Sequence, residues 1–380
     1  MAELNETPKG SRIHISFFGL RNAGKSTLVN TFCGQEIAIV SDVAGTTTDP
    51  VSKAMEILPL GPCLITDTAG LDDIGELGEM RVKKTLSVLA TTDIAIWVSA
   101  APQSHDLTIS QSYNLFLSEC ERRHVAILEY HRGDSVEELK KRIASLKLAE
   151  VQRPLLDGIV KSGDHIILVC PIDESAPKGR LILPQVQMIR ECLDLHATCT
   201  VCQPSELAAI LASGKHDIVI TDSQAFGEVR KIMSAEGSTT PLTSFSILFA
   251  RQKGDLEEYS NGIAAISTLK DGDNILIAEG CTHHRQCNDI GTVKLPKALA
   301  KLSGKKLNFT FSSGADFPIE TASGKLALIV QCGGCMLNRR EVMRRIEAAK
   351  SAGIPIVNYG MVLGAVNGMA IMPHSPFVKK

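Results

Sequence analysis

The feature that most constrains the fold is a glycine-rich stretch, GLRNAGKS, at residues 19–26. It follows an apolar segment at 12–18 and precedes a helical pattern that starts near Lys25. Glycines let backbone N–H groups wrap a phosphate, and the helix N-terminus adds a positive dipole end. Lys25 would reach the β- and γ-phosphates, and the Ser26 hydroxyl would bind Mg²⁺. The predicted nucleotide contacts of this loop are Gly19, Asn22, Ala23, Gly24, Lys25, Ser26 and Thr27.

A second motif, Asp67-Thr-Ala-Gly70, follows a predicted strand at 63–65. A carboxylate here would lie near Mg²⁺, and the Gly70 N–H would sense the γ-phosphate. Between the two motifs lie Thr46 and Thr47, where a threonine would complete the Mg²⁺ shell when triphosphate is bound. A polar surface loop is the alternative for these threonines. The predicted catalytic residues are Lys25, Thr47 and Asp67.

Strands and helices alternate along the chain, which predicts an α/β fold with a mostly parallel sheet covered on both faces. We expect a P-loop nucleotide domain at 11–150, followed by two smaller α/β domains at 158–255 and 260–380. Residues 1–10 are expected to be a disordered tail. The predicted strands of the first domain are 12–18, 54–58, 63–65, 93–99 and 125–129.

The end of the first domain lacks the usual base-reading motif. G proteins read guanine with Asn-Lys-x-Asp after the fifth strand, whereas this chain has His131-Arg-Gly-Asp134. Asp134 is the candidate acceptor for the guanine edge. The helical pattern at 136–146 already looks like the last helix of the domain, so one strand and a final guanine loop are missing. The sequence therefore predicts secure phosphate binding with weak guanine selectivity.

Three of the eleven cysteines form a candidate metal site. Cys332-Gly-Gly-Cys335 follows an apolar segment at 327–331, and Cys281-Thr-His283 follows another at 274–278. Ligand sites of α/β folds gather at the carboxyl ends of strands. Three thiolates with a possible histidine suit Zn²⁺ or an iron–sulfur cluster. A structural zinc site and a redox dithiol remain alternatives.

The other cysteines call for a simpler interpretation. Cys199 and Cys202 fall within one predicted strand, where they would point to opposite faces and be buried. The role of Cys287 is open. Five more are expected to be small buried apolar side chains: Cys33, Cys63, Cys120, Cys170 and Cys192.

The nucleotide motifs resemble the TrmE/Era-like branch of the G proteins. Asn22 stands where potassium-dependent members use asparagine to bind K⁺, although it could simply form the loop. Leu71 stands where Ras-like proteins place a water-orienting glutamine. The resemblance implies a monovalent cation beside the phosphates in place of an arginine finger.

Longer segments resemble the [FeFe]-hydrogenase maturation GTPase family, HydF: PIDESAPKGRLILPQ at 171–185, CTHHRQCNDIG at 281–291 and CGGCMLNRR at 332–340. The resemblance implies that the middle domain dimerises and that Cys281, Cys332 and Cys335 hold a [4Fe–4S] cluster with a replaceable fourth ligand. His283 is the first candidate for that ligand, because Gln331 stands where the family has its second histidine.

The resemblance also implies a function and its partners. Such a protein binds GTP, Mg²⁺ and K⁺, hydrolyses GTP slowly, accepts a di-iron precursor from two radical-SAM maturases and delivers it to apo-[FeFe]-hydrogenase. An iron–sulfur redox-sensing regulatory GTPase is the alternative, and a tRNA-modifying GTPase of the TrmE type is a third interpretation.

Charge and hydropathy limit the remaining partners. The net charge is −2 and no long single-sign run occurs, so no nucleic-acid partner is expected. The sequence contains no run of about 18 apolar residues, so we expect no membrane-spanning helix. The polar first residues lack a signal-peptide pattern, so we expect a cytoplasmic protein.

Overall fold

The chain forms two units, Glu3–Val151 and Gln152–Lys380, in the computed structural model, and each is described by itself. The structure describes residues 7–35, 50–72, 76–100, 107–146, 154–172, 181–280, 289–314, 317–321, 324–334, 336–369, 371–372 and 375–378. Across these ranges, no helix combines the length and apolar character that crossing a bilayer requires.

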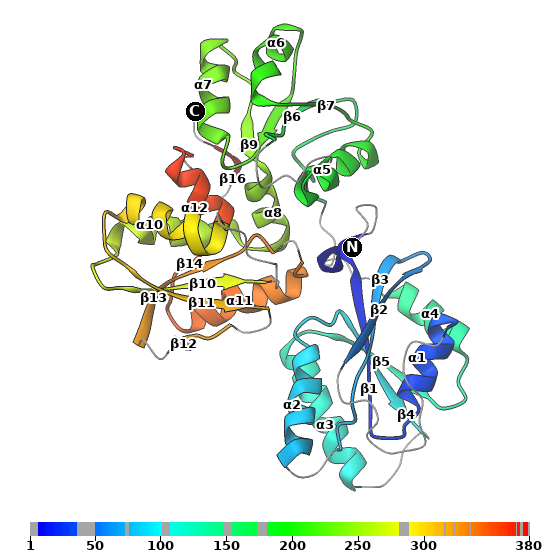
Figure 1. The fold of residues 1–380 in the computed structure, drawn as a ribbon. Coiled ribbons are helices and arrows are strands. Elements are labelled where there is room, and N and C mark those ends of the chain that lie inside the picture. Colours follow the sequence, from blue (N-terminus) through cyan, green and yellow to red (C-terminus); the bar gives the residue numbers. More distant parts are fainter. Residues whose placement is uncertain are drawn as a thin grey trace. The chain divides into compact units, whose positions relative to one another are not determined.

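The first unit is built on a sheet with the strand order β2-β3-β1-β4-β5 (Figure 1). Strand β1 pairs in parallel with β3 and β4, and β4 pairs in parallel with β5, while β2 runs antiparallel to β3. This confirms the mostly parallel α/β fold. The elements are η1 Lys9–Ser11, β1 Ile13–Phe18, α1 Lys25–Cys33, β2 Val51–Ile57, β3 Gly61–Asp67, α2 Glu76–Val88, β4 Ile94–Ser99, α3 Leu107–Arg122, β5 Ala126–His131 and α4 Val136–Ser145.

Helices cover both faces of this sheet because side chains alternate along each strand. Phe17 of β1 points to one face, where its ring meets Phe32 of α1 at a centroid distance of 5.5 Å. Phe18 points to the other face, 5.3 Å from Phe116 of α3. Strand β1 is buried throughout, as expected for a central parallel strand.

The two ends of the first unit can be compared with what the sequence predicts for them. Residues 1–6 lie outside the described residues, but the predicted disordered tail is wrong for Lys9 and Gly10, which belong to the 3-10 helix η1. Gly10 is buried, and the Lys9 carbonyl contacts His14 Nε2 at 2.9 Å. At the other end, the sheet stops at β5 in the described part of the unit. A sixth strand is absent from this described part, and the shortened end of the domain stays a prediction.

The second unit contains two larger sheets and a two-stranded sheet, which is formed by β15 (Ile371–Met372) and β16 (Ser375–Val378). One of the larger sheets has the order β7-β6-β8-β9 and is wholly parallel, and the other has the order β11-β10-β13-β12, with β14 beside β13. In the second sheet, only β12 is antiparallel to its neighbour among the described pairs.

The elements of the second unit are β6 His165–Val169, α5 Leu183–Asp194, β7 Thr198–Cys202, η2 Pro204–Glu206, α6 Leu207–Ala212, β8 Ile218–Thr221, α7 Phe226–Ala235, β9 Leu242–Ser244, α8 Phe245–Lys253, α9 Leu256–Ala265, η3 Ile266–Thr268, β10 Asn274–Glu279, η4 Ile290–Lys294, α10 Leu295–Ser303, β11 Asn308–Ser313, β12 Glu320–Thr321, β13 Gly324–Gln331, α11 Arg339–Ser351, β14 Ile356–Asn358, α12 Tyr359–Val366, β15 Ile371–Met372 and β16 Ser375–Val378. The two larger sheets belong to one compact unit, so its division into domains at 158–255 and 260–380 stays a prediction.

Cysteines in the first sheet of this unit lie where the strand pattern predicts. Cys199 packs on the face that α5 and α8 cover, and Cys202 packs on the opposite face. Both are half-buried rather than fully buried, because β7 is an edge strand. Elsewhere, Cys63, Cys120, Cys170 and Cys192 are buried as expected, whereas Cys33 is half-buried.

Helix α9 packs closely on the second sheet at Gly262. A Cβ atom at this position would fall well inside van der Waals contact of the Ile356 carbonyl oxygen in β14. Backbone atoms of a strand have little room to move, so the helix can approach this closely only with glycine.

We therefore predict that Gly262→Ala destabilises the second unit by about 1–3 kcal/mol, the usual cost of overpacking. Urea denaturation followed by far-UV circular dichroism would measure it. Gly214→Ala is the matched control, since a Cβ there meets nothing within 4 Å. Trp97 is the single tryptophan of the chain and lies in the first unit. The unfolding midpoint that its fluorescence reports should therefore be the same in both variants and the parent. Equal midpoints for the two variants would contradict the close packing.

Candidate functional site

The phosphate loop connects β1 to α1 through two glycines with special roles. A Cβ at Gly19 would collide with the carbonyl oxygen of Val98 in β4, so the loop can leave the sheet only at glycine. Gly24 has φ +93° and is the N-cap of α1, a left-handed conformation that glycine adopts without strain. The first turn of α1 carries no acidic residue. The helix N-terminus is therefore free to attract an anion.

Lys25 folds over this loop. Its Nζ donates to the carbonyls of Leu20 and Gly19, at 2.7 Å and 3.2 Å. The side chain is only 7% exposed. These contacts hold the ammonium group at the mouth of the loop, where it can reach a bound phosphate.

Ser26 and Asp67 meet beside the loop, although they are far apart in the sequence. The Ser26 hydroxyl donates to Asp67 Oδ2 at 2.6 Å. The Asp67 side chain is fully buried, and within the described part of the chain its Oδ1 atom has no hydrogen-bond partner. Burial raises the pKa of this carboxyl, against the Ser26 hydrogen bond and the nearby Lys25 charge, which lower it. A buried carboxylate oxygen beside a hydroxyl suits a hard cation such as Mg²⁺.

The residues after Asp67 turn back onto the phosphate loop. Asp72 Oδ1 accepts from the Arg21 backbone N–H at 2.6 Å, and the Leu71 N–H donates to the Gly19 carbonyl at 3.3 Å. A Cβ at Gly70 would crowd the Arg21 backbone. Asp72 could not be predicted from the sequence, because an aspartate after this motif has no pattern of its own. The structure thus adds one carboxylate to the predicted set.

The remaining predicted nucleotide contacts differ in how exposed they are. Asn22 is exposed with φ +57°, so its side chain points away from the core. Ala23 is buried against the sheet, and Thr27 is exposed on the first turn of α1. Thr46 and Thr47 lie outside the described residues.

Asp134, the candidate for guanine recognition, takes part in a local turn. Its Oδ2 atom accepts from the His131 N–H at 2.8 Å, and its carbonyl accepts from Tyr130 Oη at 2.9 Å. His131 Nδ1 in turn lies 2.7 Å from Ser99 Oγ at the end of β4. One oxygen of the carboxylate is therefore occupied within the loop, and weak recognition of guanine stays a prediction.

Strands β10 and β13, which lead into the two predicted cysteine segments, end side by side at the carboxyl edge of the second sheet. Strands β10 and β13 are parallel neighbours, with Ala278 opposite Gln331, and the Cys332 N–H donates to the Ala278 carbonyl at 2.9 Å. The Gly280 N–H donates to Cys332 Sγ at 3.0 Å. Cys281 follows Gly280 directly, so the chain enters the predicted site from both strands at one place.

A buried polar pair lies under this edge. The Gln331 amide donates from Nε2 to the hydroxyl of Tyr259 in α9. Burial raises the pKa of Tyr259, so this hydroxyl stays neutral. Gln331 is 1% exposed. Its side chain is thus committed to α9, at the position where the resemblance would place a histidine.

Most of the predicted cluster ligands fall outside what the structure describes: Cys281, His283 and Cys335, together with Cys287. Within the described residues, no three metal-binding side chains converge. Of the three predicted thiolate ligands, the structure describes Cys332 alone.

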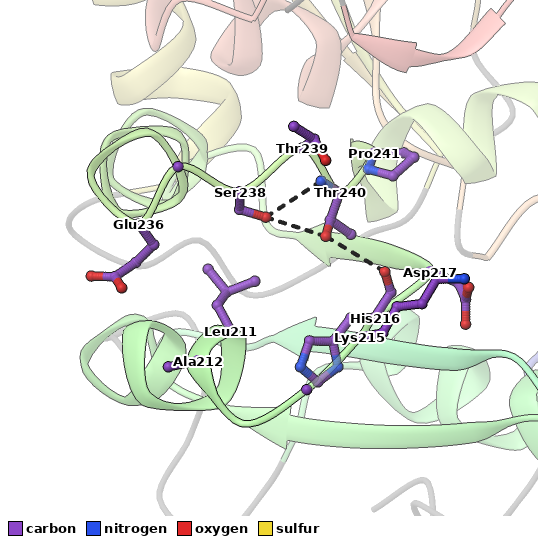
Figure 2. A pocket seen from close by; sticks show the side chains of 12 residues that line it. Leu211, Ala212, Lys215, His216, Asp217, Glu236, Ser238, Thr239, Thr240 and Pro241 are labelled. Carbon is purple, nitrogen blue, oxygen red and sulfur yellow. Dashed lines mark hydrogen bonds between the residues drawn. The ribbon is translucent and has the colours of Figure 1, made fainter.

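A polar cavity of about 480 Å³ lies elsewhere in the second unit (Figure 2). It is formed by the loops that precede β8 and β9, and Ser238 Oγ and Thr240 Oγ1 meet there at 3.2 Å. These loops lie at the amino ends of parallel strands, whereas ligands of such folds bind at the carboxyl ends. None of the predicted site residues lines it.

Three family models match the chain. The model described as the Hydrogen maturase F dimerization domain matches residues 155–254, and the one described as the Hydrogen maturase F tetramerization domain matches residues 257–375. Together these two span more than half of the chain. The model described as a 50S ribosome-binding GTPase matches residues 14–129, so the first unit is a P-loop GTPase domain.

Curated relatives are similar to the chain over about a hundred residues. The tRNA modification GTPase MnmE of Endomicrobium trichonymphae is 39% identical over 103 residues, which cover 26% of this chain and 22% of that protein. GTPase Der of Wolinella succinogenes is 40% identical over 99 residues, covering 25% and 20%. The chain thus spans about a fifth of the length of these relatives.

Asp67 gives a prediction with a defined pH dependence. Because burial raises its pKa in the folded unit, folding favours the protonated carboxyl. The protonated Asp67 carboxyl contributes fully to stability below its pKa in the unfolded chain, about 3.9. This contribution is lost as the pH rises through the higher pKa that Asp67 has in the folded unit. Asp67→Asn should escape this loss, so its stability relative to the parent should increase from acid to neutral pH. Urea unfolding of the nucleotide-free chain, followed by Trp97 fluorescence, measures it.

The same variant should lose Mg²⁺-dependent nucleotide binding, which titration with labelled nucleotide would show. A stability difference that stays constant between pH 4 and pH 7 would contradict the burial argument for Asp67.

Proposed function

Because the chain belongs to the hydrogen maturase F family, we propose that it is a GTP-binding scaffold that carries a [4Fe–4S] cluster and a di-iron precursor and delivers the precursor to apo-[FeFe]-hydrogenase. The observation that supports this most directly is the hydrogen bond from the Gly280 N–H to Cys332 Sγ. It joins the end of β10, which leads into the Cys281 segment, to Cys332 at one edge of a sheet.

The residues at this edge fit an iron–sulfur cluster. Backbone N–H groups that point at cysteine sulfur stabilise the thiolate and tune a cluster. Gly334, between Cys332 and Cys335, has φ +69°, so the chain turns sharply after Cys332. We assign Cys281, Cys332 and Cys335 as the three thiolate ligands. When bound, the cluster would supply one iron with a replaceable ligand, to which a second metal fragment can bind through a bridging group.

The fourth ligand is proposed to be His283. Gln331 is not the candidate, because its side chain is buried and its amide donates a hydrogen bond to Tyr259. Imidazole is a good iron donor, and His283 is two residues from Cys281. Cys287 is the competitor, and it would close the site with a fourth thiolate.

The GTPase domain is proposed to act as a switch with GTP and Mg²⁺ bound by Lys25, Ser26 and Asp67. We assign Thr47 to the Mg²⁺ shell in the triphosphate state and Asn22 to K⁺. The binding energy of the γ-phosphate would then bias partner binding or release rather than cluster chemistry.

Self-association follows from the two maturase domains, whose family models are named for dimerization and tetramerization. We propose a homodimer built by residues 158–255 that works in the cytoplasm. Two radical-SAM maturases would supply the precursor.

We predict that Ala substitution of Cys281, Cys332 or Cys335 abolishes cluster loading and hydrogenase activation. Each thiolate would ligate one iron, so the loss of one thiolate leaves too few ligands to bind the cluster stably. The measurements are iron per chain after reconstitution, and hydrogen production when the protein is mixed with apo-hydrogenase and both maturases.

Cys199→Ala, in the edge strand β7, is the matched control and should load normally, as should Cys287→Ala. Loss of the cluster in Cys287→Ala with no effect of His283→Ala would rule out the open-site carrier and favour a redox sensor.

We predict that GTP hydrolysis requires Mg²⁺ and runs faster in K⁺ than in Na⁺. Lys25 is the phosphate contact, so Lys25→Ala should weaken GTP binding at least tenfold. The measurements are phosphate release in the two salts and equilibrium binding of labelled GTP. Equal rates in K⁺ and Na⁺ would contradict the assignment of Asn22 to K⁺. Unchanged GTP binding by Lys25→Ala would contradict the assignment of the phosphate site.

A further inference from the structure

A carboxylate to which the sequence motifs give no role lies against the phosphate loop, in the segment that follows the Asp67-Thr-Ala-Gly70 motif. Asp72 Oδ1 accepts from the Arg21 backbone N–H at 2.6 Å, and Asp72 Oδ2 lies 3.8 Å from Arg21 Nε. The Asp72 side chain is only 18% exposed, whereas that of Arg21 is 40% exposed. The carboxylate is therefore held closely by a backbone donor of the loop, and more loosely by a guanidinium group that water screens.

The residue before Asp72 anchors this segment. The Leu71 N–H donates to the Gly19 carbonyl at 3.3 Å, and the Leu71 carbonyl accepts from Ser112 Oγ of α3 at 3.2 Å. The Leu71 side chain is buried in the same apolar cluster as Trp97 and Phe116. Asp72 therefore extends from an anchored backbone, and its place beside the loop is set by the fold.

The third phosphate of a bound nucleotide would lie on the same side of the loop. Mg²⁺ bridges the β- and γ-phosphates, and its proposed ligands are Ser26 and Asp67, whose side chains meet at 2.6 Å. Gly70, whose N–H would sense the γ-phosphate, follows Asp67 by three residues. A Cβ atom at Gly70 would lie 2.8 Å from Asp72 Oδ1. The Asp72 carboxylate is therefore next to the group that the third phosphate would approach.

This carboxylate treats a triphosphate and a diphosphate differently. Both nucleotides would bind the N-terminus of α1, whose first turn carries no acidic residue. Any nucleotide that takes the Arg21 N–H displaces Asp72 from it, but only a triphosphate also brings negative charge to Gly70. Like charges repel, and at a partly buried site the repulsion changes an equilibrium constant several-fold. Asp72 therefore penalises a triphosphate more than a diphosphate.

We propose that Asp72 is a specificity-determining residue of the GTPase domain, whose charge opposes the third phosphate and lowers the affinity for GTP relative to GDP. This inference rests on the phosphate site proposed for Lys25, Ser26 and Asp67. The contacts of Lys25 and Mg²⁺ with the third phosphate favour GTP, and the repulsion from Asp72 offsets part of that preference. Hydrolysis removes the third phosphate and with it the repulsion, so Asp72 also favours the state that follows hydrolysis.

The test separates the charge of Asp72 from its hydrogen bond. Asp72→Asn removes the charge and keeps an oxygen that can accept from the Arg21 N–H. Glu56→Gln is the matched control, because it removes the same charge from an exposed position on the edge strand β2. Each full-length protein is titrated with fluorescently labelled GDP and with a labelled, non-hydrolysable GTP analogue, in the presence of Mg²⁺ and at two salt concentrations.

We expect the ratio of GTP-analogue affinity to GDP affinity to rise roughly three- to tenfold in Asp72→Asn and to stay at the parent value in Glu56→Gln. The rise should shrink at the higher salt concentration, because salt screens charges that water reaches. A purely structural role would change both affinities together and would not respond to salt in this way. An Asp72→Asn ratio equal to that of Glu56→Gln at low salt overturns the inference and leaves the phosphate site standing. A parent protein that binds neither nucleotide overturns both.

A second variant keeps the test decisive if Asp72→Asn does not fold, which far-UV circular dichroism would show. Asp72→Glu keeps the charge and should keep the affinity ratio of the parent. A ratio for Asp72→Glu that rises as far as expected for the neutral variant would show that the charge is not what matters, and would also overturn the inference.

Discussion

Parallel strand pairing is the constraint on which both candidate sites depend. When two strands run side by side in the same direction, their carboxyl ends reach one edge together. In the second unit, the pairing of Ala278 with Gln331 brings Gly280 to Cys332, although 52 positions separate the two in the chain. The hydrogen bond to the sulfur is a consequence of that register. A slip of one residue would turn Cys332 to the other face of the sheet.

The first unit uses the same constraint for a different chemistry. Phe17 lies opposite Asp67 in the parallel pair of β1 and β3, so the loop after β1 and the carboxylate at the end of β3 begin at one level. Ser26 then reaches Asp67 from the first turn of α1. The desolvation of Asp67 follows from ending a buried strand with a charged residue. The nucleotide site is therefore built at the expense of some stability of the free domain.

The sequence was informative where function requires a local pattern and silent where it depends on contacts across the fold. The phosphate loop, its helix and the strands before the cysteines could be predicted, because glycine spacing and apolar runs are local signals. Asp72 could not be found, since it acts through a backbone group that only folding brings near. The ordered segment at Lys9 was missed for the same reason: a contact with His14 fixes it. Short elements such as β9 and β12 carry too few residues to show a period.

The contact between Asp72 and the Arg21 N–H has a consequence for what can enter the phosphate loop. In the described form, a carboxylate of the chain itself occupies a backbone donor of that loop. An incoming anion must displace it, and only a ligand that gains several other contacts at once can do so. Inorganic phosphate and sulfate would compete poorly, whereas a triphosphate held along its whole length would succeed. In this form the loop would therefore favour a long polyanion over a small one.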